Sequence, residues 1–209
     1  MERIRPVPRD EVTSPLVRSM YDYLFGDRDP VAEPGTGDGT PGDWWTVMAV
    51  SPAAFEHAVG GILYYQSPER VLDPVHRELA QARIGWAAGS QFVYSQHCRA
   101  MRKHGFSEER IAAVAAWAAA ECFDATERCV LAYADCLVYD HGRVPDALFD
   151  ALRAALGDEA VVELTYIATL YLQHAVMTRA LRLELDDRDE PVVEADGPAE
   201  GPAGLGRPR

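Results

Sequence analysis

Hydrophobic residues recur at helical spacing along most of the chain. The apolar positions between residues 10 and 25 fall on one side of a helix, and the same period continues from Trp44 almost without interruption. No stretch shows the sustained period-two alternation of a half-buried strand. The pattern predicts an all-α protein, a compact helical bundle with helices that begin near residues 10, 44, 52, 74, 90, 107, 124, 145 and 158, the last running to about residue 185.

Two segments depart from this helical pattern. Residues 26–43 are dense in Gly, Pro and Asp, which predicts a long flexible loop or, as an alternative, a lid over a site. Residues 186–209 are acidic and rich in Pro and Gly, which predicts a disordered tail. A chain of this length fits one hydrophobic core, so we expect a single helical domain over residues 1–185.

The charge of the chain narrows the classes of partner. With 20 Lys and Arg against 33 Asp and Glu, the formal net charge is -13, which argues against nucleic acids and anionic membranes as partners. No uninterrupted apolar run approaches the roughly 20 residues that cross a bilayer, and the first residues lack the apolar segment of a secretory signal. We therefore expect a cytoplasmic protein that binds a small molecule rather than a nucleic acid or a membrane.

Neither the cysteines nor the histidines show a pattern typical of a redox or metal centre. Cys98, Cys122, Cys129 and Cys136 contain no C-x-x-C pair, and we expect them to be buried small side chains in a reducing compartment. The six histidines lack metal-ligand spacing such as H-x-x-x-H. The sequence thus predicts no metal site and no bound cofactor.

Residues 76–104 carry the strongest candidate for chemistry. Two predicted helices meet at Gly89-Ser90, with Glu78 eleven residues before Gly89 and His97 eight after it. At 1.5 Å per residue these separations are about 16 and about 12 Å, so both side chains lie at nearly the same level of a helical hairpin. A buried carboxylate beside an imidazole is typical of a proton-transfer pair, and it can equally be a structural hydrogen bond that closes the hairpin.

The same region resembles a known family. The R-E-L run at 77–79, the G-S-Q-F-V-Y-S-Q-H run at 89–97 and the A-M-R-K-H-G-F-S-E-E-R-I run at 100–111 resemble the core motif of the carboxymuconolactone decarboxylase and alkylhydroperoxidase D-like superfamily. The resemblance implies a helical fold of the alkylhydroperoxidase D type. It also implies a site around Glu78 and His97, and assembly as a homo-oligomer.

This chain departs from two branches of that superfamily. The peroxide-reducing branch carries C-x-x-C where this chain has Ser90 and Val93, so a peroxidatic thiol cycle is not expected. Cys98 lies about 100° around the helix from His97 and is a weak substitute. In another branch, two acidic residues stand where this chain has Gln91 and Val93, which implies a smaller acid-base network.

Five further residues are candidates for the site. Tyr94, three residues before His97, can donate its hydroxyl to a substrate, or it can be a core aromatic residue. For substrate binding we consider four side chains, each of which has a structural alternative as a core or surface contact: Gln91, Arg83, His174 and Trp45.

Three functions follow from these observations. The first is a cofactor-free acid-base lyase or isomerase, decarboxylase-like, acting on a small oxo-acid, lactone or polyketide-like substrate through His97, Glu78 and Tyr94. The second is a non-catalytic helical module that binds a ligand or takes part in assembly. The third, a peroxidase, is disfavoured by the missing cysteine pair. The Ala-rich run at 111–120 is a candidate contact surface for a homo-oligomer, or part of the core.

Overall fold

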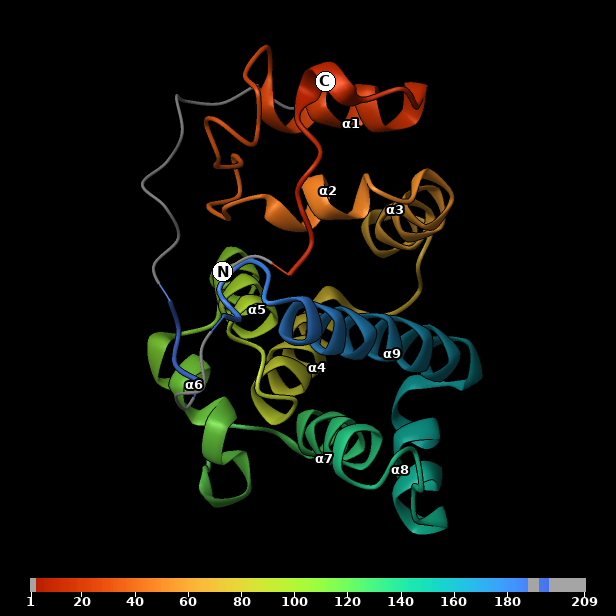
Figure 1. Ribbon diagram of the computed structural model, residues 1–209. Helices are drawn as coiled ribbons and strands as arrows, with labels where there is room; N and C mark the ends of the chain where they lie inside the picture. The colour runs from red at the N-terminus through yellow and green to blue at the C-terminus, as the bar shows by residue number, and fades with distance from the viewer. Residues whose placement is uncertain (1–2, 188–191, 196–209) are drawn as a thin grey trace. The chain divides into compact units, whose positions relative to one another are not determined.

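The computed structural model describes residues 3–187 and 192–195. Within that range there are α-helices and short 3-10 helices but no strands, which confirms the prediction of an all-helical protein (Figure 1). The elements in chain order are η1 (Arg9–Glu11), α1 (Pro15–Phe25), α2 (Asp43–Met48), α3 (Pro52–Gln66), α4 (Pro74–Ala87), α5 (Gln91–Lys103), α6 (Glu108–Ala113), η2 (Val114–Ala119), α7 (Ala125–Tyr139), α8 (Asp146–Leu156) and α9 (Asp158–Leu181).

The described residues group into two compact units by their contacts. Unit 1 comprises residues 3–66, 178–187 and 195, and unit 2 comprises residues 67–177 and 192–194. Both units contain residues from 1–185, the range that the sequence predicted to form one domain. That single domain stays a prediction. Most of the predicted tail lies outside the described residues.

Unit 2 is built around a hairpin of α4 and α5, which lie side by side in Figure 1. Gly89 takes a left-handed conformation with φ of 75°, and the Ser90 hydroxyl caps α5 by accepting a hydrogen bond from the Val93 amide. Gly85 allows the two helices to approach closely, since a Cβ atom there would lie 2.4 Å from the Tyr94 nitrogen. Gly85 therefore lies where the two helices pack against each other.

Two predicted helices end earlier than their sequence pattern suggests. The helix expected over residues 107–120 changes from α6 to the 3-10 helix η2, with non-helical dihedrals at Ala116. Two arginine side chains stabilise the 3-10 segment by donating hydrogen bonds to its carbonyl groups. Arg83 comes from α4 and Arg128 from α7. The last helix ends at Leu181, where Arg182 turns the backbone to φ of 57° and the Leu183 amide bonds back to the Thr178 carbonyl.

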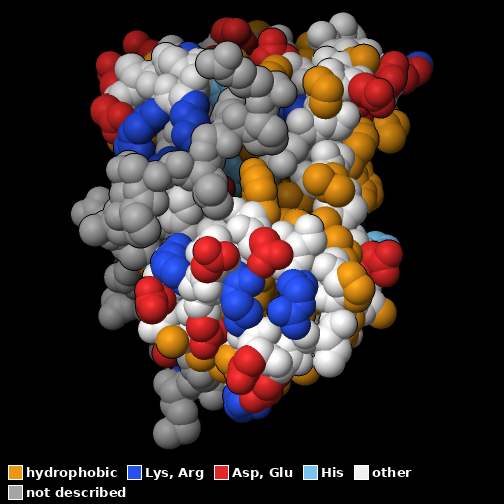
Figure 2. Space-filling model, turned by 90° about the horizontal axis from the view of Figure 1, so that it is seen from above, with side chains coloured by type: hydrophobic (Ala, Val, Ile, Leu, Met, Phe, Trp, Pro, Cys, Tyr) orange, Lys and Arg blue, Asp and Glu red, His pale blue; other side chains and the backbone are white. Residues whose placement is uncertain are grey.

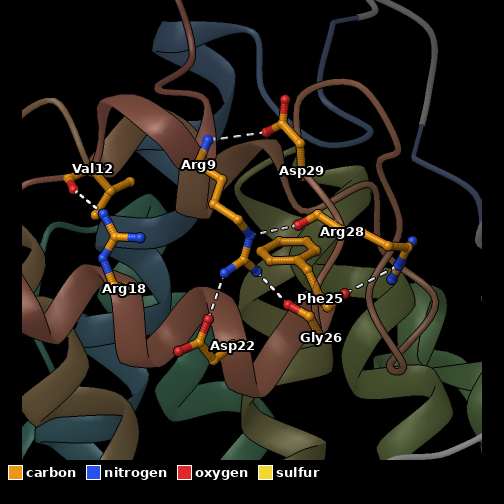
Figure 3. Close-up of polar contacts among 8 residues, drawn as sticks. All are labelled: Arg9, Val12, Arg18, Asp22, Phe25, Gly26, Arg28 and Asp29. Carbon is orange, nitrogen blue, oxygen red and sulfur yellow. Dashed lines mark hydrogen bonds and ion pairs between the residues drawn. The ribbon is translucent and has the colours of Figure 1, made fainter.

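In unit 1 the segment 26–43 contains no helix before Asp43, as the sequence predicted, and arginines bind its first turns. Arg9 donates to the carbonyl groups of Gly26 and Arg28 and to the Asp22 carboxylate, while its own amide donates to Asp29 (Figure 3). These contacts satisfy carbonyl groups that follow the end of α1. The role of this segment as a lid stays a prediction.

The chain after α9 also packs within unit 1. The Glu184 carboxylate accepts hydrogen bonds from the Gly42 and Trp44 amides at the start of α2, and the Asp43 carboxylate accepts one from the Glu184 amide at 2.8 Å. Burial raises the pKa of both carboxyl groups. The Asp43 charge raises the pKa of Glu184 further, whereas hydrogen bonds from Glu184 lower the pKa of Asp43. This reciprocal pair joins residue 184 to α2, about 140 residues away in sequence.

The surface of the described residues is of mixed charge. On the face seen in Figure 2, acidic and basic side chains lie interspersed instead of forming separate fields. Of the described helices, only α9 is long and apolar enough to span a bilayer by length and composition. Core helices of globular proteins meet the same criterion, and 44% of the most apolar stretch of α9 is buried in the structure.

Candidate functional site

The acidic member of the site is placed by the start of α4. Asp73 caps this helix by accepting a hydrogen bond from the Val75 amide at 2.7 Å, and Pro74 occupies its first turn. The helix is then buried on all sides from Arg77 to Gly85. Glu78 has no exposed surface, so its charge is acceptable only with close partners.

Glu78 has a different partner on each carboxylate oxygen. Oε2 lies 2.7 Å from Nδ1 of His97, and Oε1 accepts hydrogen bonds from Nε and Nη2 of Arg77 at 2.8 and 2.7 Å. A carboxylate can only accept hydrogen bonds, so the proton on Nδ1 is donated to Glu78, and Nε2 is the ring nitrogen left with a lone pair that can take a proton. The predicted meeting of Glu78 and His97 is therefore present in the structure.

Helix α9 completes the surroundings of His97. The Tyr171 ring packs edge-on against the imidazole of His97 with 4.4 Å between ring centroids, and His174 packs against Tyr171 at 5.4 Å. Both histidines are buried, with 2% and 5% of their surface exposed. Burial, and secondarily the charge on His97, lowers the pKa of His174 to about 4. His174 is thus a neutral, polar wall of the site at neutral pH.

The depressed pKa of His174 predicts a specific acid sensitivity. A histidine whose pKa falls from 6.5 to about 4 on folding stabilises the fold above pH 6.5 and loses that contribution as the pH falls toward 4. Between pH 7 and pH 4.5 we expect wild type to lose about 2 kcal/mol more unfolding free energy than His174→Gln. Urea unfolding at both pH values measures this difference, and equal losses in the two proteins would contradict the assignment.

Tyr94 lies one turn before His97 on α5 and packs into the interior of unit 2. It belongs to an apolar cluster with Leu79, Cys98 and Met101. Burial raises the pKa of the Cys98 thiol to about 12, so the sulfur is protonated at neutral pH. The aromatic ring in contact with His97 is that of Tyr171, and a substrate contact of Tyr94 stays a prediction.

Arg83 makes structural contacts in place of the substrate contact that was predicted. Its guanidinium binds the Asp135 carboxylate through two nitrogens, at 2.5 and 3.1 Å, and donates to the carbonyl groups of Val114 and Ala115. It also lies over the Trp86 ring at 4.5 Å. These contacts join α4 to α7 and η2, which was the structural alternative for this residue.

The other two predicted binding residues have contacts of their own. Gln91 is buried at the start of α5, where its amide donates to the Ser95 hydroxyl at 3.3 Å and accepts from the Val193 amide at 3.2 Å. Trp45 belongs to unit 1 and packs edge-on against Trp44 and Phe55. Of the four residues predicted to bind substrate, His174 is the one linked to His97 through Tyr171.

The sequence did not single out Arg77 or Tyr171. Arg77 is adjacent to Glu78 in sequence. A buried carboxylate needs a nearby positive charge, so this neighbour could have been predicted as its partner. Tyr171 lies three residues before His174 and therefore on nearly the same helix face, but nothing in the sequence shows which helix faces α5.

No other cluster in the described residues offers the same chemistry. Among residues 3–187 and 192–195, no group of three or more His, Cys, Asp and Glu side chains is placed to hold a metal ion. A cavity of about 520 Å³ lies in unit 1, bordered by Arg5, Val12, Val17 and Val50 among others. None of its lining residues belongs to the site around His97, which lies in unit 2.

Comparisons with known proteins find a family match over the middle of the chain. The sequence profile of the carboxymuconolactone decarboxylase family matches residues 51–135, a range that includes both Glu78 and His97. YnjA of Escherichia coli strain K12, an uncharacterized protein, is 30% identical over 131 residues, which cover 63% of this chain and 70% of YnjA.

Solved structures show the same fold. A protein of unknown function from Agrobacterium tumefaciens, described as a candidate AhpD antioxidant defence protein, matches with a TM-score of 0.60 and 25% identity over 65% of this chain and 92% of that one. The debrominase Bmp8, in a cysteine-to-alanine variant bound to tribromopyrrole, matches with a TM-score of 0.65 at 15% identity, covering 87% of this chain and 90% of that one. At this low identity the debrominase shows a shared fold alone.

Proposed function

Because this chain belongs to the carboxymuconolactone decarboxylase family, we propose that it is an acid-base lyase or isomerase that acts on a small oxo-acid, lactone or polyketide-like substrate. The observation that carries the proposal is the fully buried pair of Glu78 and His97, joined at 2.7 Å. Such a pair supplies proton transfer with the side chains of the chain itself, and no cofactor is needed for this step.

His97 is proposed as the residue that exchanges protons with the substrate. When Nε2 takes a proton, the imidazolium is stabilised by the Glu78 carboxylate on Nδ1, and Arg77 balances the charge on the other oxygen of that carboxylate. His174 stays neutral, since its pKa is about 4, and therefore does not compete for the proton at neutral pH.

Loss of CO₂ from a 3-oxo acid is the reaction that this arrangement suits best. The electron pair of the breaking carbon-carbon bond moves onto the adjacent carbonyl to form an enolate, and CO₂ leaves. The imidazolium of His97 then delivers its proton to the carbon that carried the carboxyl group. The protein has only to stabilise delocalised charge and hold one proton, which matches the groups around His97.

Two alternatives are weaker. Thiol-dependent peroxide reduction needs a cysteine with a lowered pKa, whereas burial raises the pKa of Cys98 to about 12 and Ser90 and Val93 occupy the positions of the motif cysteines. A helical module that only binds a ligand would have the same fold and would leave small oxo-acids unchanged. Homo-oligomer assembly and cytoplasmic location stay predictions.

Hydrogen-deuterium exchange offers a test that does not require the natural substrate. We expect the protein in D₂O to accelerate exchange at the carbon next to the carbonyl group, or CO₂ release, in a panel of small 3-oxo acids and enol lactones. General acid-base catalysis predicts an acceleration of about 10²-fold or more over buffer. Proton NMR measures both reactions. Rates equal to those of buffer for the whole panel would favour the binding module.

A further inference from the structure

Gln81 is a buried amide whose polar atoms have no protein partner. Its side chain in α4 has no exposed surface, and neither its Nε2 nor its Oε1 makes a hydrogen bond. Leaving buried donors and acceptors unsatisfied costs about 1–3 kcal/mol per group, so native proteins rarely retain them without a function. The second buried glutamine of unit 2, Gln91, has both of its polar atoms bound.

The helix geometry places Gln81 on the side of the hairpin where the site lies. Glu78 and Gly85 mark the face of α4 that meets α5, through the His97 contact and the close approach to Tyr94. Ala82 lies on one flank of this face, toward the apolar cluster. Gln81 precedes Ala82 by one residue, about 100° around the axis, and therefore lies on the opposite flank.

The same division holds for α5. Tyr94, Cys98 and Met101 belong to the apolar cluster, while His97 lies about 100° around the axis from Cys98. Because α4 and α5 run antiparallel, the flanks turned away from the cluster are on the same side of the hairpin. Gln81 and His97 thus share one side, and Gln81 is three residues, about 4.5 Å of rise, from Glu78.

We infer that Gln81 is a substrate-binding residue that recognises a carbonyl and an enol hydroxyl in 1,3 relation, the pattern of an enolised 3-oxo acid or 1,3-dicarbonyl compound. The amide Nε2 donates to the carbonyl or enolate oxygen, and Oε1 accepts from the hydroxyl. The Nε2 contact also stabilises the enolate that forms when His97 moves the proton. The choice of ligand class rests on the proposed function.

Protein stability tests the first half of this inference without any substrate. Gln81→Met replaces the unsatisfied amide with an apolar side chain of similar length, and we expect the thermal unfolding midpoint to rise by about 2–4 °C. The matched control is Gln91→Met, which removes a buried amide that is bound and should lower the midpoint. If Gln81→Met lowers the midpoint as Gln91→Met does, the amide has partners inside the protein and the inference fails.

Binding of acetylacetone, which is largely enolised, tests the second half. We expect acetylacetone to bind wild type, and its affinity to fall at least about tenfold in Gln81→Met. The gem-dimethyl derivative of acetylacetone cannot form the central enol and should bind both proteins equally weakly. Titration calorimetry measures the four affinities. Absence of binding to wild type, or equal affinity of acetylacetone for both proteins, would overturn the inference.

These results are separable from the fate of the proposed reaction. If acetylacetone binds through Gln81 while no oxo-acid exchanges deuterium or loses CO₂, the binding role stands and the acid-base function fails. If exchange occurs with full efficiency in Gln81→Met, the function stands and the role of Gln81 fails.

Discussion

Replacing His97 with alanine is expected to lower turnover by about 10²–10⁴-fold, the range that a positioned acid-base group contributes. His97 has the proton-exchanging Nε2 of the site, and its orientation is set by the Glu78 carboxylate 2.7 Å from Nδ1. The measurement is deuterium exchange or CO₂ release with the most active 3-oxo acid of the panel. Added imidazole should restore part of the rate, because it can supply the missing proton-transfer group.

A histidine on the same helix provides the control. His104 follows the last turn of α5 and is exposed, so His104→Ala should keep the wild-type rate. Circular dichroism establishes that both variants are folded. A folded His97→Ala protein with the wild-type rate would remove His97 from the mechanism, even if His104→Ala behaves as expected.

Removing the buried carboxylate is expected to destabilise the protein more than any other single change in the site. Glu78→Ala takes away the anion that Arg77 and His97 share in the interior. Breaking a buried ion pair by deleting one partner typically costs about 3–5 kcal/mol. Urea unfolding at neutral pH measures the loss, and the change in unfolding midpoint at constant slope reports it directly.

Two comparisons separate charge from packing in this experiment. The double variant Arg77→Met with Glu78→Ala removes both charges and should recover part of the stability, since it no longer buries the guanidinium. Glu108→Ala deletes a carboxylate that pairs with Arg102 on the surface and should leave stability close to wild type. A loss for Glu78→Ala no larger than that for Glu108→Ala would show that the pair contributes little.

Much of the fold is predictable from the sequence because helix boundaries depend on local chemistry. Asp73-Pro74 and Ser90 begin α4 and α5 through caps that involve neighbours two or three residues away. Where a boundary depends on distant groups, the prediction missed it. The 3-10 turn at Ala116 is stabilised by arginines from other helices, and no local pattern shows those partners.

The candidate site was predictable in part for the same reason. Glu78 and His97 lie on consecutive helices joined at Gly89, so counting residues from the hinge places them at one level. Tyr94 and Arg83 lie on the same two helices, but Tyr94 packs in the apolar cluster and Arg83 binds Asp135. Helical period gives the face on which a side chain lies, and it does not identify the helix that packs there.

The sequence alone determines three features: the helical class, the hairpin that joins Glu78 and His97, and the absence of a cysteine pair at Ser90 and Val93. Each depends on residue identity and spacing within one continuous segment. The tertiary structure decided that Arg77 shares the carboxylate, that Tyr171 and His174 complete the site from α9, and that Gln81 is buried without a partner. These features arise between segments far apart in the chain, where packing selects the neighbours and burial sets the charge state.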